Sequence, residues 1–114
     1  MANLLILETS AVVPEEGRPA PEKLVGGTPT NRTWNVEDDG KGTYAGIWES
    51  TPGEWRISYT EWEFCHILAG VSVLTEDGGV PVTLKAGDSF VIRPGFNGTW
   101  NVVETTVKHY VIRL

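Results

Sequence analysis

At 114 residues the chain is long enough to bury one hydrophobic core and too short for two domains. Fifteen acidic residues against nine basic ones give a formal net charge of −6, which repels phosphate backbones and anionic lipids, so we expect neither nucleic acid nor a membrane as a partner. Thirteen glycines and seven prolines favour tight turns, and five tryptophans supply bulky core residues, a composition typical of an all-β domain.

The N-terminal apolar run, Met1 to Leu7, lacks the basic flank, the length and the cleavage site of a signal peptide. No stretch reaches the ~20 apolar residues that a membrane-spanning helix needs. Cys65 is the single cysteine and has no partner for an internal disulfide, which fits a reducing compartment. We therefore expect a cytoplasmic protein.

The first third of the chain has the weakest β-signal. Asn3 to Glu8 reads as a strand, whereas the proline-rich stretch from Val13 to Pro29 disfavours regular structure and reads as an arm that wraps the domain. Thr33 to Val36 is predicted as a short strand that ends in an acidic turn. We divide the single domain into an N-terminal strand and arm, 1–42, and a barrel core, 43–114.

Strands and turns alternate in the predicted core. Thr43 to Ser50 reads as a strand, and Trp55 to Leu68 runs through β-favouring residues with a break near Thr60-Glu61. Asp77-Gly78 is the strongest hairpin signal, because it lies between two apolar, β-branched runs. Further strands are predicted at 89–92, 99–103 and 106–113. Nine or ten short strands without a helix of any length predict an antiparallel barrel or jelly roll.

Two segments of the core resemble the motifs of the cupin superfamily, the RmlC-like small β-barrels. Glu63 to Gly70 reproduces the glutamate, six residues and glycine that close the first motif, and Gly87 to Gly95 reproduces the start of the second. The resemblance implies a single-domain cupin barrel. It also implies a metal held by three histidines and a glutamate, which is the usual cupin site.

The histidines of that site are missing from the matching positions. With Glu63 as anchor, the histidine slots of the two motifs fall on Ile57, Tyr59 and Gly98. With Gly53 as anchor, they fall on Tyr59 and Glu61, and the glutamate slot on Cys65 or His66. We therefore expect no cofactor. A divalent metal on Tyr59, Glu61, Glu63 and Cys65 is the alternative.

Within the superfamily the chain looks like the small single-domain group related to the cupin domain of (S)-ureidoglycine aminohydrolase. The features that carry this resemblance are Trp48, Pro52-Gly53, Glu63 to Gly70, Gly87-Asp88, Trp100 and Lys108. In that enzyme a manganese ion is held by a Glu, two His and a Gln, a set that this chain does not reproduce. The resemblance therefore implies the scaffold more than the reaction.

Strand alternation gives a candidate site inside the barrel. Alternate residues from Ile57 to Cys65 share one face, and the motif turns this face inward. A buried Glu63 needs a cationic or hydrogen-bonding partner, and Lys108 is the best candidate. We predict Glu63 and Lys108 as catalytic residues, if the protein is an enzyme, and a ligand-binding set of Trp48, Tyr59, Glu61, Glu63, Trp100 and Lys108. The structural alternatives are a buried ion pair for Glu63, a water-facing turn for Glu61 and core packing for the two tryptophans.

Three functions remain open. The first is a barrel without the histidine-based metal site that binds a small polar metabolite. The second is an enzyme that resembles ureidoglycine aminohydrolase and acts on a small amide or ureide. The third is a structural or regulatory dimer whose outer aromatic face, with Trp62 and Phe64, meets another protein. By analogy with such barrels we expect a homodimer in which Asn3 to Glu8 pairs with the other subunit.

Overall fold

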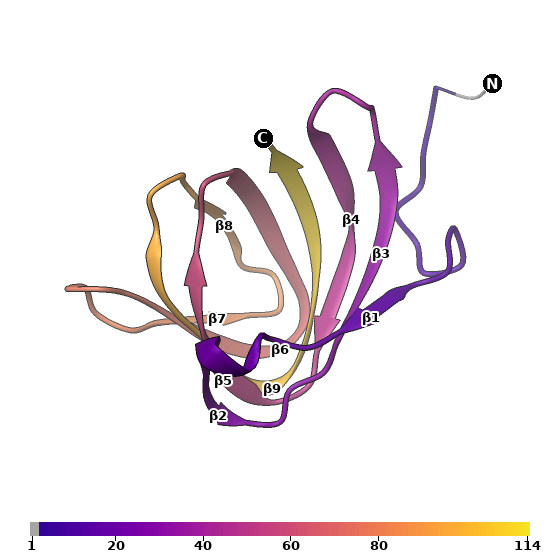
Figure 1. Ribbon diagram of the computed structural model, residues 1–114. Coiled ribbons are helices and arrows are strands. Elements are labelled where there is room, and N and C mark those ends of the chain that lie inside the picture. Colours follow the sequence, from indigo (N-terminus) through magenta and orange to yellow (C-terminus); the bar gives the residue numbers. More distant parts are fainter. Residues whose placement is uncertain (1–2) are drawn as a thin grey trace.

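A computed structural model describes residues 3–114, whose regular secondary structure is β apart from one 3-10 turn (Figure 1). The elements of these residues are β1 (Glu15–Gly17), the 3-10 helix η1 (Pro21–Lys23), β2 (Leu24–Gly27), β3 (Asn31–Asp38), β4 (Thr43–Ser50), β5 (Gly53–Ser58), β6 (Trp62–Glu76), β7 (Val82–Lys85), β8 (Ser89–Ile92) and β9 (Asn97–Arg113). Every strand pair is antiparallel. The predicted all-β barrel or jelly-roll class is confirmed.

The two long strands, β6 and β9, pair with each other along most of their length and organise the whole molecule. The first half of β6 and the second half of β9 continue into β8, β4, β3 and β1. The second half of β6 and the first half of β9 continue into β7, β5 and β2. The result is one curled sheet whose two halves face each other, as the curvature of the strands in Figure 1 shows.

The bend in β6 lies at Gly70, where the pairing with β9 shifts register. Gly70 has φ +85°, a region that L-residues with a side chain rarely occupy, and a Cβ there would overlap the carbonyl oxygen of Thr105. The glycine that ends the first motif therefore permits the bend rather than ending the strand. For this reason β6 and β9 are single bent strands. The sequence predicted a strand that ends at Leu68 and another from Val71 to Thr75 in place of β6, and separate strands at 99–103 and 106–113 in place of β9.

Inward-facing apolar residues fill the side of the barrel formed by β6, β7 and β8. The core cluster consists of Trp55, Cys65, Ile67, Leu74, Leu84, Ile92, Trp100 and Val102. A chain of buried polar groups crosses it, in which Trp100 Nε1 donates to Ser72 Oγ at 3.1 Å and Ser72 Oγ lies 2.7 Å from Thr106 Oγ1. Thr106 donates in turn to the carbonyl of Glu104 at 2.9 Å, so each buried hydroxyl has its partner.

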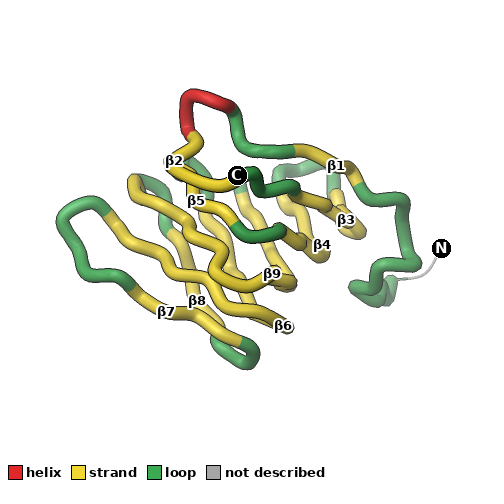
Figure 2. The backbone as a smooth tube through the Cα atoms, turned by 90° about the horizontal axis from the view of Figure 1, so that it is seen from below, coloured by secondary structure: helices red, strands yellow, loops and turns green. Residues whose placement is uncertain are grey.

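The N-terminal arm forms a strap across the open side of the curled sheet. β1 pairs with β3 at one edge, β2 pairs with β5 at the other, and η1 lies between them (Figure 2). The predicted wrapping arm thus contains two short strands. β3, also before residue 43, pairs with β4 along its length.

The segment before the strap differs from the sequence prediction. Residues 3–8 form no strand in the single chain, and Leu4, Leu5 and Ile6 expose 76%, 49% and 59% of their surface. Pairing of this segment with a second copy stays a prediction. Among residues 3–114 no helix has the length and apolar character to cross a membrane.

Candidate ligand-binding cavity

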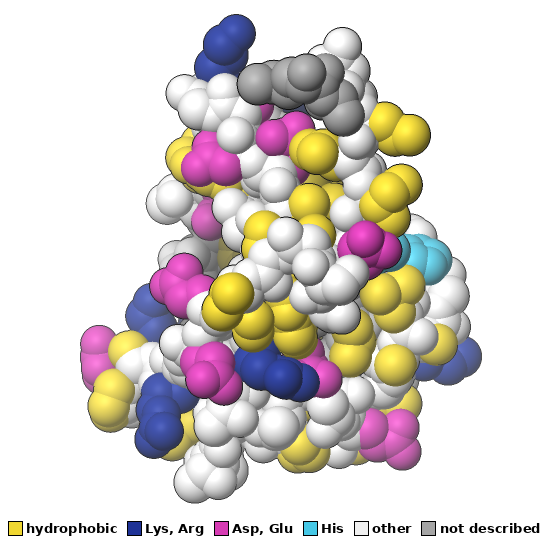
Figure 3. All heavy atoms as spheres, turned by 90° about the vertical axis from the view of Figure 1, so that its right-hand side faces the viewer, with side chains coloured by type: hydrophobic (Ala, Val, Ile, Leu, Met, Phe, Trp, Pro, Cys, Tyr) yellow, Lys and Arg dark blue, Asp and Glu magenta, His cyan; other side chains and the backbone are white. Residues whose placement is uncertain are grey.

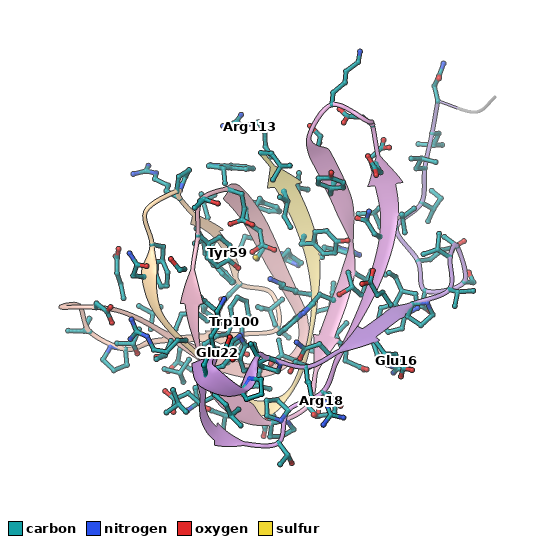
Figure 4. The ribbon with its side chains drawn as sticks, in the orientation of Figure 1. Glu16, Arg18, Glu22, Tyr59, Trp100 and Arg113 are labelled. Carbon is teal, nitrogen blue, oxygen red and sulfur yellow. The ribbon has the colours of Figure 1, made fainter. Side chains whose placement is uncertain are left out.

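A cavity of about 560 Å³ lies between the two halves of the sheet, under the strap. Figure 4 shows Tyr59 and Trp100 directed into the interior, with Glu16, Arg18 and Glu22 on the strap. The lining residues come from the strap (Glu15, Pro19, Ala20, Lys23), from β3 and β4 (Asn31, Thr33, Asn35, Tyr44, Trp48), from β5 and the turn after it (Trp55, Arg56, Ile57, Ser58, Tyr59, Glu61), and from β6 and β9 (Glu63, Trp100, Lys108, Tyr110, Ile112). Its volume suits a small metabolite.

A buried ion pair lies in the wall of this cavity. Lys108 Nζ is 3.1 Å from Glu63 Oε2, and both side chains are about 95% buried, with 4% and 5% of their surface exposed. The hydroxyl of Tyr59 donates to the other carboxylate oxygen, Glu63 Oε1, at 2.6 Å. Each oxygen of the carboxylate thus has a donor, which offsets the desolvation that an isolated buried carboxylate would suffer.

The Lys108 ammonium is held on several sides. Its Nζ lies 3.3 Å from Cys65 Sγ and stands over the rings of Trp100 and Trp48, at 4.3 Å and 4.9 Å from the centroids. Burial opposes the charged form of Lys108, but Cys65 and Glu63 beside it favour the charge, so the pKa of the ammonium is raised. Lys108 is therefore a fixed positive charge at neutral pH.

The neighbouring acids keep their protons. Burial, followed by the negative charge of Glu63, raises the pKa of Tyr59 well above its ordinary value of 10.0. Burial raises the pKa of the Cys65 thiol to about 12, although Lys108 acts in the opposite direction. Burial and Glu63 raise the pKa of Tyr110 to about 12. At neutral pH Tyr59 is thus a hydrogen-bond donor to Glu63, and Cys65 is a thiol.

The absence of a side chain at Gly46 on β4 allows a hydrogen bond between β9 and β3. Asn35, Gly46 and Tyr110 occupy one row across β3, β4 and β9. The Tyr110 hydroxyl crosses Gly46 and donates to Asn35 Oδ1 at 2.6 Å. A Cβ at Gly46 would overlap the Trp34 carbonyl and lie 2.9 Å from that hydroxyl, so this contact needs glycine.

The structure brings the predicted site residues together. Trp48, Tyr59, Glu61, Glu63, Trp100 and Lys108 all line the cavity, and the expected pairing of Glu63 with Lys108 is present. Their roles in binding or catalysis remain predictions. Glu61, for which a water-facing turn was the alternative, lies in the turn between β5 and β6 and still lines the cavity.

Several lining residues were missed from the sequence. Asn31, Thr33 and Asn35 alternate along β3 and face the cavity, and Glu15 and Lys23 reach it from the strap. The alternation Asn-x-Thr-x-Asn was the signal for the first three residues, because it places three polar side chains on one face of a strand. Trp62, Phe64, His66 and His109 do not line the cavity, as their alternation with Glu63, Cys65 and Lys108 predicts.

The residues in the motif positions do not fit the metal that the fold implies. Ile57 and Gly98 offer no donor, and a Cβ at Gly98 would overlap the Thr75 carbonyl, which excludes any side chain on this backbone. Within residues 3–114 no three His, Cys, Asp or Glu side chains converge as metal ligands. Lys108 Nζ itself lies between Glu63 and Cys65, where it would repel a metal cation.

Comparison with known protein families identifies the family of this barrel. A family model described as an EutQ-like cupin domain matches residues 31–110, from the start of β3 into β9. The chain belongs to the EutQ-like cupin family. The predicted cupin superfamily is thereby confirmed, and no curated protein matches the chain.

Solved structures support the same fold. A Pseudomonas syringae protein of unknown function from the DUF861 family is 25% identical, with a TM-score of 0.82 over 93% of this chain and 46% of that one. This chain therefore spans about half the length of that structure. A predicted oxalate decarboxylase from Thermotoga maritima is 19% identical, with a TM-score of 0.74 over 96% and 99% of the two chains. A putative ethanolamine utilization protein Q from Salmonella typhimurium is 18% identical, with a TM-score of 0.68 over 95% and 90%. The last two share the fold alone.

Proposed function

We propose that this cupin binds a small, polar, nitrogen-containing or carboxylated metabolite in the cavity. The observation that carries the proposal is the buried Tyr59–Glu63–Lys108 cluster in the wall of a ligand-sized cavity. A purely structural ion pair needs no cavity beside it, whereas a binding site needs both the space and a few fixed polar groups.

The unused hydrogen-bonding capacity of the wall indicates what the ligand offers. Each Glu63 oxygen accepts one bond from protein and has a further lone pair, and Lys108 donates to Glu63 and Cys65 and has a third proton. Asn31 Oδ1 is buried, and no group within residues 3–114 donates a hydrogen bond to it. A ligand with N–H donors and at least one acceptor oxygen, such as an amide, an amino acid or an amino alcohol, complements this set.

Aromatic walls favour a flat apolar or amide portion in the same ligand. Trp48 and Trp100 pack edge to face with their centroids 5.2 Å apart, and both line the cavity with Trp55. Such rings contact apolar or amide surface at low entropic cost because they are already packed.

The test is a thermal-shift screen of the full chain against small amides, ureides, amino acids, amino alcohols and carboxylic acids, with calorimetry on each hit. The panel includes ethanolamine and oxalate, which occur in the names of two similar structures. We expect at least a tenfold loss of affinity in Glu63→Gln and in Tyr59→Phe, a variant that keeps the ring. Arg113→Ala, outside the cavity lining, is the matched control. Unchanged affinity in Glu63→Gln and Lys108→Ala would refute the site.

An enzyme that hydrolyses or isomerises a small amide or ureide, as in ureidoglycine aminohydrolase, is the second candidate. The observation that favours it is the position of Glu63 as a base beside Lys108, a fixed charge able to stabilise a developing oxyanion. Incubating each hit with protein and following it by NMR separates the two functions. A hit that binds and stays chemically intact contradicts the enzyme and leaves the binding protein.

A homodimer through residues 3–8 is a further proposal. Leu4, Leu5 and Ile6 are exposed and apolar. Within residues 3–114, β1, β2, β7 and β8 each pair with a single neighbouring strand, so each leaves an open edge. Light scattering at micromolar concentration is expected to give twice the chain mass, and Leu5→Asp with Ile6→Asp is expected to give the monomer. A monomeric wild type would overturn this proposal, including the role of a structural dimer.

A further inference from the structure

The two histidines of the chain are neighbours on the outer face of the sheet. β6 and β9 pair with His66 opposite His109, and the residues on either side of them, Cys65, Ile67, Lys108 and Tyr110, are buried on the inner face. His66 and His109 therefore point away from the cavity. Both are partly exposed, and Figure 3 shows histidine atoms at the molecular surface next to hydrophobic side chains. They belong to no part of the proposed metabolite site.

Directly opposed residues on antiparallel strands have Cβ atoms about 4.5–5.5 Å apart. Two imidazoles at this separation can turn their ring nitrogens to about 3.3 Å from each other, the spacing that two bonds of 2.0–2.1 Å to one tetrahedral ion require. The strand pairing fixes the two backbones in advance, so little entropy is lost when a cation bridges the rings.

A third residue orients one of the two rings. His66 Nδ1 lies 2.7 Å from Ser89 Oγ on β8, which pairs with β6 at this position. When Nδ1 donates to the hydroxyl, Nε2 carries the free lone pair and is available as a ligand. Metal-binding histidines commonly have such a partner on the second nitrogen, which fixes the tautomer and the direction of the ring.

We propose that His66 and His109 form a chelating site for a late first-row divalent cation such as Cu²⁺, Ni²⁺ or Zn²⁺, with Ser89 as a positioning residue. Imidazole pairs favour these ions over Mg²⁺ and Ca²⁺, which prefer oxygen ligands. The net charge of −6 attracts cations in general. With two protein ligands the site is open, and its other positions are filled by water or by donors from a second molecule.

The test is calorimetric titration of the full chain, prepared without an affinity tag, with each chloride salt near neutral pH. We expect one cation per chain, a dissociation constant in the micromolar range, and Cu²⁺ as the tightest ligand. His66→Gln and His109→Gln are each expected to weaken binding at least tenfold, and Ser89→Ala several-fold. NMR of the wild type gives a second readout, in which Zn²⁺ shifts the ring resonances of both histidines.

Two controls separate this site from the cavity. Glu63→Gln and Cys65→Ala are expected to keep full cation affinity, because their side chains face the opposite side of the sheet. The proposal is overturned if the variant with both histidines replaced binds as tightly as wild type, or if Zn²⁺ leaves the wild-type histidine resonances unmoved. Loss of cation binding in Glu63→Gln would likewise place the cation inside the barrel.

Discussion

The two sides of the barrel are built from the same pair of strands and have opposite interiors. Toward β7 and β8, the inner face of β6 carries Ile67 and Leu74, which pack with Leu84 and Ile92 into a filled apolar core. Toward β3, β4 and the strap, the inner faces of β6 and β9 carry Glu63, Lys108 and Tyr110 around an open cavity.

The two sides share the pairing of β6 with β9. The difference shows that the inward-facing side chains determine whether the interior is filled or forms a cavity. Trp55 and Trp100 belong to both regions, since each is part of the core cluster and also lines the cavity. The polar cluster thus rests on the packed core, which holds its tryptophan rings in place.

The largest effect is expected on the cavity side, from Lys108→Ala. This change leaves Glu63 buried without its cation, and we expect a loss of about 3–5 kcal/mol in the free energy of unfolding, measured by urea denaturation. The paired change Glu63→Gln with Lys108→Met removes both charges and is expected to be less destabilising than Lys108→Ala alone. Equal losses for the two proteins would show that the ion pair is not the cause.

On the packed side, Ile67→Ala is expected to destabilise the protein by about 2–5 kcal/mol, because Ile67 is fully buried and its removal opens a new cavity. Ile57→Ala, in the wall of the existing cavity, is the matched control, with an expected loss of about 1 kcal/mol. Urea denaturation of both variants checks the contrast. Similar losses would contradict the division into a filled and a hollow side.

Alkaline pH is expected to lower the stability of the fold through Cys65, Tyr59 and Lys108, which lie where the packed core meets the cavity. Folding raises the pKa of Cys65 from 9.0 to about 12 and raises those of Tyr59 and Lys108, so the folded protein keeps protons that the unfolded chain releases. The stabilisation that these groups contribute is therefore fully present below about pH 9 and is lost as the pH rises toward 12. The loss is about 1.4 kcal/mol per pH unit for each group once the pH exceeds the pKa of that group in the unfolded chain. Urea titrations at several pH values measure the slope.

Cys65→Ala is the control for the alkaline effect. The variant lacks the group that begins to ionise at the lowest pH, so its stability is expected to stay flat to about pH 10. A slope identical to that of wild type between these values would show that the thiol does not take part.

The smallest effect is expected at the surface. Arg56 and Asp77 form an ion pair at 2.6 Å with side chains 45% and 55% exposed, in contrast to the buried pair of Glu63 and Lys108. Arg56→Ala is expected to leave the urea midpoint unresolved from wild type, because water and salt screen such pairs. A clear loss of stability would show that exposure does not separate the two ion pairs.

The sequence predicted those parts of the fold and site that depend on the alternation of side chains along one strand, or on the one charged partner that a buried residue needs. Alternation between Ile57 and Cys65 placed Glu63 inward, and the need of a buried carboxylate for a cation pointed to Lys108. The hairpin at Asp77-Gly78 followed from its turn residues, and β6 and β7 pair across it.

Features that depend on the packing of distant strands were not predictable. Gly70 read as the end of a strand, because the sequence does not show that Thr105 approaches its backbone. The contact of Tyr110 with Asn35 depends on a row that crosses three strands at Gly46. The strap residues Glu15 and Lys23 reach the cavity only because β1 and β2 pair with opposite edges of the sheet.

The tethered ammonium of Lys108 has a consequence for how the cavity is controlled. A cation that is part of the chain is present at one copy per molecule, needs no supply from the cell and survives any chelator. The ammonium loses its positive charge only when it is deprotonated, and the raised pKa of Lys108 moves this deprotonation further from neutral pH. The interior of this barrel is therefore charged from the moment it folds.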